Sequence, residues 1–439
     1  MSSVPLPRTL LVLCLSQGVG AIGLAAGAAA GPLLAEEVTG SASRGPMAMG
    51  ALVVGSALAG PAAAALMRRK GRVPGLAACY LTAALGALIV ILSISWGALG
   101  SLAFAALLAG SVLLGTGTTG SMLGRYLAAD LVGAGRQAHA MGLAVGALTI
   151  GAVAGPVLLG PSGALAASLG LDRLTGLHLI AMVVFPLAAL ICVPLHGISR
   201  RAGAAREGSE AVPETAAAPP GEAAAVPAPG GRILPLAVLA TGNLSMVAIM
   251  GSAPGHLQHH GWSLTAVGVL MAAHIGGMFA FSPVSAALCR RLGSRTTAVI
   301  GAGAMVAVLL LGVLGLGRTS DAVVVFLVGA AWNMHLVSGS AWLVEVTPEP
   351  LRHRTEGLGE LAMGAAAAVG TFALAGPLLA LGGLAAVCAA LAVVGAGAGV
   401  VFRFGGGRRK STGPAAASAP EVSPAPEASP ARADDLTRS

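Results

Sequence analysis

Long apolar stretches with almost no charge recur along the whole chain, and this recurrence constrains the fold more than any other feature. A helix that crosses a bilayer needs about 20 predominantly apolar residues. Twelve such stretches stand at residues 9–35, 46–67, 74–95, 99–124, 137–160, 175–196, 233–253, 264–288, 296–316, 322–345, 357–381 and 384–402. Charged residues make up 10% of the 439 residues, against about 25% in soluble proteins. The pattern excludes a single soluble core and predicts an all-α integral membrane protein with twelve transmembrane helices.

Two polar segments divide these stretches into two groups of six. Residues 197–232 are rich in Ala, Pro and Glu, which is typical of a flexible linker, and residues 405–439 have the composition of a disordered tail. We therefore predict a six-helix bundle at 1–196, the linker at 197–232, a second six-helix bundle at 233–404 and the tail at 405–439.

Basic residues are distributed unevenly between the two sides that twelve crossings define. Of the 25 Lys and Arg residues, all except Arg44, Arg125, Arg173 and Arg318 fall on or near the side that holds both termini and the linker. Loops rich in Lys and Arg remain on the cytoplasmic side of a membrane. We therefore expect a multi-pass protein of a bacterial cytoplasmic membrane with both termini in the cytoplasm. This placement also explains the net charge of +8 without nucleic-acid binding.

The two groups of helices repeat each other in sequence. The segment from Ala65 to Arg72 matches Ala287 to Arg295, and Gly155-Pro156 corresponds to Gly376-Pro377. Proline kinks a helix because it lacks a backbone N–H, so the Gly-Pro pairs are candidates for bends that shape a gate. The alternative is close packing of small residues. Two pseudo-symmetric six-helix bundles around a long linker are typical of transporters whose halves rock about a midplane site.

These motifs resemble the major facilitator superfamily over about residues 9–402. The basic loop of that family is represented here by Gly71 and Arg72 and, in the second copy, by Gly293. Arg68 and Arg290 stand at the two positions where the family has an acid. The resemblance implies that these five residues belong to a gate, and the lost acids remove the salt bridge that the family uses there.

The fifth stretch is similar to the drug/proton antiporters of the same family, whose pattern is G-x8-G-x3-G-P-x2-G-G. All but one position of the pattern is matched, by Gly142, Gly151, Gly155, Pro156 and Gly160. The fourth stretch departs from the family because it lacks the membrane-embedded arginine. The resemblance implies export in exchange for protons, with the bend of the fifth helix at the gate.

Ionisable residues inside apolar stretches are costly and commonly functional. His274 lies in the eighth stretch, His335 in the tenth, and Glu360 one turn into the eleventh. We take these three as candidates for carrying a coupling proton, because histidine titrates near neutral pH. The alternatives are neutral histidines bonded to a neighbouring helix and an acid that stabilises a helix N-terminus. Glu360 or Glu356 is also a candidate partner for Arg68.

Four further residues are candidates for lining a central cavity: Gln17, Asn243, Trp332 and Asn333. Their alternative role is hydrogen bonding between helices. Near the fourth stretch, Asp130 is expected to form an interfacial ion pair with Arg125 or Arg136 rather than to carry a proton.

Charged residues at the outer ends of helices are given no functional role. Glu36 and Glu37 are expected to be solvated. The spacing of His256, His259 and His260 in an outer loop suits a metal ion, but no acid or cysteine accompanies them in the sequence. We therefore expect no metal site.

The sequence predicts a secondary active transporter rather than an enzyme. The chain has no P-loop, no nucleophile–histidine–acid arrangement and no HExxH motif. We expect no cofactor, and we expect a monomer whose partners are the lipid bilayer, a small-molecule substrate and protons. Proton-coupled efflux of a small lipophilic compound by alternating access is the main hypothesis. Uptake of a small organic solute is the first alternative, and a membrane receptor without transport is the second.

Overall fold

The computed structural model describes residues 8–95, 100–132, 137–197, 229–348 and 352–404. Within these ranges every regular element is helical, which confirms the all-α prediction. Eleven helical stretches are long and apolar enough to cross a membrane, and the last, from Gly357 to Phe404, is 48 residues long. A break in that stretch at Gly382 and Gly383 separates the positions of the eleventh and twelfth predicted spans. The predicted count of twelve crossings agrees with this arrangement.

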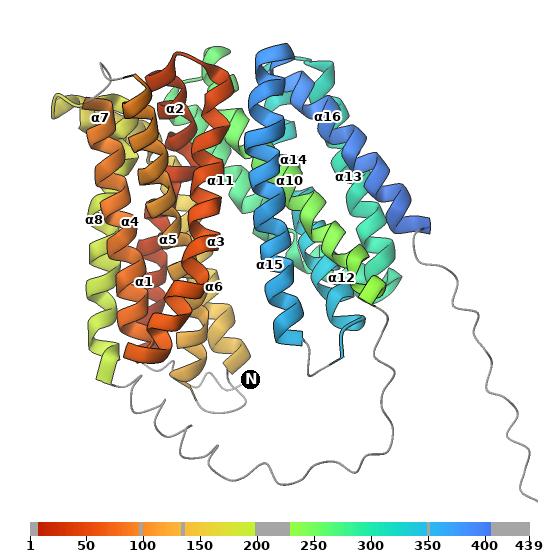
Figure 1. Ribbon diagram of the computed structural model, residues 1–439, viewed down its shortest axis with the longest axis horizontal. Coiled ribbons are helices and arrows are strands. Elements are labelled where there is room, and N and C mark those ends of the chain that lie inside the picture. Colours follow the sequence, from red (N-terminus) through yellow and green to blue (C-terminus); the bar gives the residue numbers. More distant parts are fainter. Residues whose placement is uncertain (1–7, 96–99, 133–136, 198–228, 349–351, 405–439) are drawn as a thin grey trace, which may run out of the picture. The chain divides into compact units, whose positions relative to one another are not determined.

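The first half of the chain is built from six spans, several of which contain more than one helical element. In chain order the elements are α1 (Arg8–Ala25), η1 (Ala26–Ala30), α2 (Gly31–Thr39), η2 (Ala42–Arg44), α3 (Gly45–Lys70), α4 (Arg72–Ser95), α5 (Ser101–Asp130), α6 (Gln137–Val157), α7 (Leu159–Ser168), η4 (Arg173–Thr175), α8 (Gly176–Cys192) and η5 (Val193–Leu195). Helix α4 packs on α5, α1 packs on α6, and α3 packs on α5 (Figure 1).

The second half repeats this plan. Its elements are η6 (Pro229–Arg232), α10 (Ile233–His259), α11 (Leu264–Ala280), α12 (Ser282–Leu292), α13 (Ser294–Leu314), α14 (Arg318–Glu345), α15 (Arg352–Ala368), η8 (Val369–Ala375) and α16 (Gly376–Phe404). Within this half α13 packs on α14 and α16, and α10 packs on α14 and α15. Across the halves, α11 lies against α6, and α3 lies against α10 and α15.

Small residues allow the helices to approach closely, as the high glycine content predicts. A Cβ atom built on Gly55 would lie 1.9 Å from the carbonyl oxygen of Val112, and one built on Gly115 would lie 2.1 Å from that of Leu52. Side chains at these positions would therefore push α3 and α5 apart.

The helical body has two ends, which hold different segments of the chain. Six crossings return the chain to the side on which it started, so Arg8, Leu195 and Ile233 share one end, which we call the linker end. The opposite end, which holds Glu36, His259 and Arg318, is called the loop end.

Candidate functional site

The two halves approach each other closely near the loop end. A Cβ built on Gly268 of α11 would lie 2.1 Å from the carbonyl oxygen of Pro156 in α6. One built on Gly251 of α10 would lie 3.2 Å from Pro46, and one on Gly376 would lie 2.6 Å from the carbonyl oxygen of Ser43. Because each pair joins elements of different halves, these contacts hold the halves together at that end.

The Gly-Pro pair of the fifth span lies at this contact. Helix α6 contains Pro156 and ends at Val157, and α7 begins at Leu159. The break fits the bend that the motif predicts. Glycines of this span also make the close packing that was the alternative: Cβ atoms on Gly151 and Gly155 would lie 2.0 Å from the Gly18 carbonyl oxygen and 2.7 Å from Ala25 Cβ of α1, respectively.

The corresponding pair of the eleventh span follows a local change of helix type. The seven-residue π-helix η8 ends at Ala375, directly before Gly376 and Pro377. π-helical turns are frequent at functional sites. An irregular stretch of helix thus adjoins the Gly-Pro pair in each half, after the pair in the fifth span and before it in the eleventh.

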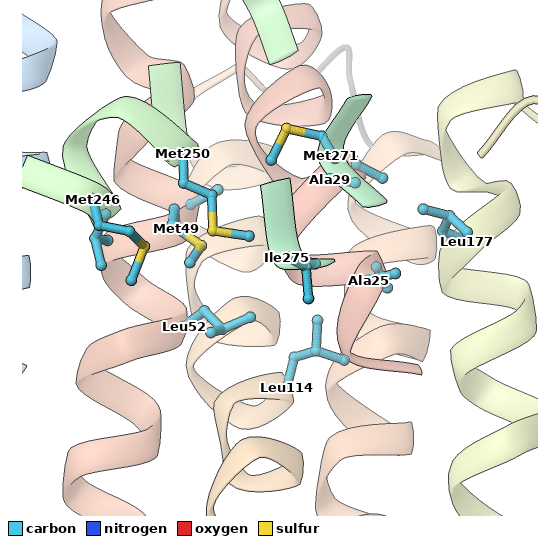
Figure 2. Close-up of a cluster of buried hydrophobic side chains, with 14 of the residues drawn as sticks. Ala25, Ala29, Met49, Leu52, Leu114, Leu177, Met246, Met250, Met271 and Ile275 are labelled. Carbon is cyan, nitrogen blue, oxygen red and sulfur yellow. The ribbon is translucent and has the colours of Figure 1, made fainter. Parts of the chain in front are cut away.

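An apolar cluster fills the contact between the halves beneath the loop end. Its side chains are buried and come from both halves: Figure 2 shows Met49, Leu52 and Leu114 opposite Met246, Met250, Met271 and Ile275. Methionine is flexible and polarisable, and it fits apolar groups of varied shape. Apart from thioether sulfur, the labelled side chains present carbon only, so the cluster matches an apolar molecule better than a charged one.

The two candidate histidines lie enclosed within the second half. His274 is fully buried in α11, and its Nδ1 contacts the Val325 carbonyl oxygen of α14 at 2.6 Å, whereas its Nε2 has no hydrogen-bond partner. His335 is 3% exposed, and its Nδ1 contacts the Ala331 carbonyl oxygen of its own helix at 3.0 Å. A proton on either ring would place a charge among buried groups, which is costly without a partner.

Asn243 and Trp332 form one polar connection within the second half. The Trp332 indole donates to Asn243 Oδ1 at 3.1 Å, and the Asn243 amide donates to the Met363 carbonyl oxygen at 2.8 Å. Asn243 is partly exposed. It thus joins α10 to α14 and α15.

Asn333 and Gln17 lie in helix packing, which was the alternative to a cavity. The Asn333 amide donates to the Met278 carbonyl and the Ser282 hydroxyl, and the Ser285 hydroxyl donates to Asn333 Oδ1. These bonds span the break between α11 and α12. Gln17 is 1% exposed and lies against Gly124 of α5 inside the first half.

The structure does not pair Glu360 with Arg68, which was one of the two candidate pairings. Both side chains are exposed, and among the residues whose side chains the structure describes neither forms an ion pair. The side chain of Glu356 lies outside them. At this loop Arg72 pairs with Asp130, so the ion pair predicted for Asp130 is present, with Arg72 as a partner that was not predicted. Arg136 also lies outside the described residues.

The two basic loops have matching backbones. Gly71 ends α3 at φ 95° and Gly293 ends α12 at φ 83°, a conformation that glycine adopts without strain. The Gly71 N–H donates to the Met67 carbonyl and the Gly293 N–H donates to that of Cys289. Arg68 and Arg290, which stand where the family has acids, are both exposed. The two copies of the loop therefore share their backbone conformation although neither has the acid.

At the loop end, charged groups from segments far apart in the chain form pairs. The sequence did not predict these pairs. Glu36 of α2 contacts His259, the last residue of α10, and His256 lies 3.6 Å from Asp321 of α14. The expectation that Glu36 is simply solvated is therefore wrong, since only 15% of its side chain is exposed. Glu37, also expected to be solvated, interacts with Asp172. Within the described part of the chain, no group of three or more His, Cys, Asp or Glu residues is arranged to hold a metal ion.

Two cavities adjoin these pairs. One of about 170 Å³ lies between the halves and is lined by Glu36, His256 and His259 together with Gly45, Ser252 and Leu384. A wider one of about 740 Å³ is lined by Glu36, Glu37, Asp172, Arg173, His259 and Trp262. No signal in the sequence brings these residues together, because they come from segments far apart in the chain.

Comparisons with known proteins agree with this architecture. Residues 233–434 match the model of the Major Facilitator Superfamily. The chain is 33% identical to the uncharacterized MFS-type transporter YdeG of Bacillus subtilis (strain 168) over 374 residues, or 83% of this chain and 84% of that protein. It is 30% identical to the uncharacterized MFS-type transporter YddS of the same organism over 373 residues, covering 83% of each chain.

Solved structures share the fold at low sequence identity. The xylose transporter XylE from E. coli in an inward-open conformation superimposes with a TM-score of 0.67 at 14% identity, covering 92% of this chain and 97% of that one. The peptide transporter POT in complex with sulfate has a TM-score of 0.67 at 14% identity, with coverages of 92% and 95%. A bacterial homologue of the iron transporter ferroportin in an inward-facing state has a TM-score of 0.63 at 16% identity, with coverages of 91% and 100%.

Proposed function

The chain belongs to the Major Facilitator Superfamily, and on that premise we propose that it is a secondary active transporter that exports a small lipophilic compound in exchange for protons. The alternative function is the uptake of a small organic solute, and a demonstration of uptake would replace this proposal. Membership of the family supports a membrane transporter. The proposed substrate class, direction of transport and coupling to protons rest on the features below.

The apolar cluster between the halves carries the proposal. A substrate that passes between the halves meets Met49, Met246, Met250 and Met271. Burying a sugar or an ion there would leave polar groups without partners, which is costly. A lipophilic compound has few polar groups that would lose hydrogen bonds there, and flexible thioethers pack against varied apolar shapes.

We propose alternating access as the mechanism. The approach of Gly268 to Pro156 and of Gly376 to Ser43 supports a state that is closed at the loop end. Separation of these contacts, with the halves 1–196 and 233–404 moving as units, would expose the apolar cluster to that end. The irregular helices before Gly376 and after Pro156 are the hinges in this proposal.

Among the proton candidates, we propose His274 as the carrier. Its Nε2 is buried without a partner, while its Nδ1 is held by another helix. A movement of α11 against α14 would change what faces Nε2, and His335, bonded to its own helix, lacks this feature. Glu360 is exposed at the linker-end part of α15 and is proposed as the group that exchanges protons there.

We further propose that the linker end is cytoplasmic. The basic residues in the last turns of α3 and α12 lie at that end, and loops rich in Lys and Arg remain on the cytoplasmic side. Both termini would then be cytoplasmic in a bacterial cytoplasmic membrane, and the protein would act as a monomer, since the two bundles of one chain enclose the proposed path.

Everted membrane vesicles from a host without its own efflux pumps test the proposed function. A proton gradient is established and followed with an acridine probe, and lipophilic dyes, drugs and organic acids are added one at a time. We expect lipophilic compounds to collapse part of the gradient. His274→Gln should abolish this response, and Met49→Gln should weaken it, while the volume-conserving Met49→Leu should preserve it.

Two results would contradict the proposal. A response restricted to polar solutes would remove the lipophilic substrate class. Accumulation of a solute in the opposite direction would replace export by uptake. An unchanged response in His274→Gln would exclude that residue as the proton carrier and leave His335 and Glu360 to be tested in the same vesicles.

A further inference from the structure

The halves are joined at the loop end by a contact between two titratable side chains. Glu36 lies in α2 of the first half, and His259 is the last residue of α10 in the second half. The carboxylate oxygen Oε1 of Glu36 is hydrogen-bonded to Nε2 of His259. The Glu36 side chain is 15% exposed and that of His259 is 62% exposed. The acid is thus covered by the contact, while the imidazole remains open to the loop end.

The backbone of α10 is shaped to receive this carboxylate. A Cβ built on Gly255 would lie 2.3 Å from Oε2 of Glu36, so only glycine at this position lets the acid lie where it does. One oxygen of Glu36 therefore faces α10 at Gly255 and the other faces His259. Both contacts depend on the two halves being together at the loop end.

Other charged groups of the first half surround the acid. Glu37 follows it in α2, and Asp172 and Arg173 line the same 740 Å³ cavity as Glu36 and His259. Glu37 and Asp172 interact with each other within the first half. Arg173 is the cation that this half contributes near Glu36. These groups stay with the first half and do not bridge to α10.

The remaining charged groups belong to the second half. The His256 and His260 rings lie with their centroids 4.1 Å apart and their planes tilted by 38°, and His256 Nε2 lies 3.6 Å from Asp321. Arg318 donates to the carbonyl oxygens of His260 and Gly261. These interactions stay within the second half. Among the described residues, the contact that joins titratable side chains of both halves is therefore the one between His259 and Glu36.

We propose that His259 and Glu36 form a latch that closes the loop end and that protonation of His259 strengthens it. Histidine changes charge between about pH 5 and 8, and a charge-assisted hydrogen bond is stronger than a neutral one. The exposure of His259 limits the gain, because exposed ion pairs are screened by water. We expect acid to raise the ratio of closed to open molecules by about two- to fivefold.

The latch gives the transporter a response to the pH at the loop end. In the closed state His259 faces that side, so its proton does not cross the membrane. The latch changes how often the loop end opens and leaves the number of protons exchanged per substrate unaltered. This inference rests on the alternating access proposed above, and it adds a regulatory group to that mechanism.

Distance measurements on the full chain in lipid nanodiscs test the latch without substrate. Spin labels are placed at the exposed loop-end positions Ser168→Cys in α7 and Thr319→Cys in α14, with Cys14→Ala and Cys289→Ala in the background. In the labelled protein that retains Glu36 and His259, the ratio of molecules with the closed distance to those with the open distance should be two- to fivefold larger at pH 5.5 than at pH 8.

Latch variants and a neighbouring control separate the latch from other titrations. His259→Gln and Glu36→Gln should lose the pH response, and His259→Lys should stay closed at both pH values because its cation is permanent. Gly255→Ala should lower the closed fraction at both, since the added methyl displaces the acid. His260→Gln should behave as wild type, because His260 has no described contact with Glu36.

The proposal is overturned by a full pH response in His259→Gln or in Glu36→Gln, or by loss of the response in His260→Gln. Absence of any pH response in the spin-labelled protein that retains Glu36 and His259 would overturn it as well. Thermal unfolding of each variant shows that it is folded, and His259→Lys gives a positive result that a folding defect cannot imitate. Since no flux is measured, failure of the latch leaves the proposed export to its own test.

Discussion

Replacement of Gly268 by alanine should open the loop end. A Cβ at this position would lie 2.1 Å from the Pro156 carbonyl oxygen and 3.0 Å from Leu159 Cβ. The nearest atom belongs to the backbone and cannot rotate away as the end of a side chain can. Helices α6 and α11 must therefore separate, and because they belong to different halves, the strain acts on the closed state.

The size of the effect follows from the cost of overpacking. An extra methyl group in a well-packed contact costs about 1–3 kcal/mol. The open state does not bear this cost, so the ratio of closed to open molecules should fall by about 5- to 150-fold. The lower part of that range applies where α6 yields at its break after Val157.

Chemical labelling of Ser252→Cys measures this change. Ser252 is 3% exposed and lines the 170 Å³ cavity between the halves, so a membrane-impermeant maleimide reaches it when the loop end opens. In a Cys14→Ala and Cys289→Ala background, the labelling rate should rise by the same factor in Gly268→Ala. Gly276→Ala is the matched control, because it lies in the same helix and its Cβ would have no neighbour within 4 Å.

Two outcomes would refute this reasoning. Equal labelling rates in Gly268→Ala and Gly276→Ala, with unchanged thermal stability, would show that the contact with Pro156 does not hold the loop end closed. A lower melting temperature of Gly268→Ala without faster labelling would show that the contact supports the fold in both states.

Two contacts at other positions lead to further expectations. Asn243→Leu should lower the free energy of unfolding by about 1–3 kcal/mol, because the Trp332 indole and the Met363 carbonyl lose their partner; thermal unfolding in detergent measures this, and an unchanged midpoint would contradict it. Asp130→Asn removes the charge that pairs with Arg72, so the free energy of unfolding should fall. An unchanged unfolding midpoint would show that this ion pair does not stabilise the fold.

The parts of the fold that depend on local composition could be predicted from the sequence. The twelve spans follow from the length of each apolar run, because every crossing must satisfy the same membrane thickness. The matching turns at Gly71 and Gly293 follow from the repeated basic loop, and the Gly-Pro motif of the fifth span lies next to the end of α6 at Val157.

Contacts between the halves could not be predicted in this way. Glu36 and His259 are separated by 223 positions, and each alone has the composition of a solvated helix end. The approach of Gly268 to Pro156 is set by how two bundles meet, which no local pattern contains. Asn333 was assigned to a cavity because its polarity was visible, whereas its three partners across the α11–α12 break were not.

Purified protein in proteoliposomes provides the most direct test of proton-coupled export through an apolar path. A lipophilic compound that responds in vesicles is placed at equal concentration inside and outside proteoliposomes that hold the protein at known orientation, and an inward-directed proton gradient is imposed at the loop end. The account predicts that the compound leaves against its own concentration gradient, that one or more protons enter per molecule, and that a protonophore stops both. Flux that only follows the concentration gradient, or that runs inward with the protons, would contradict the account.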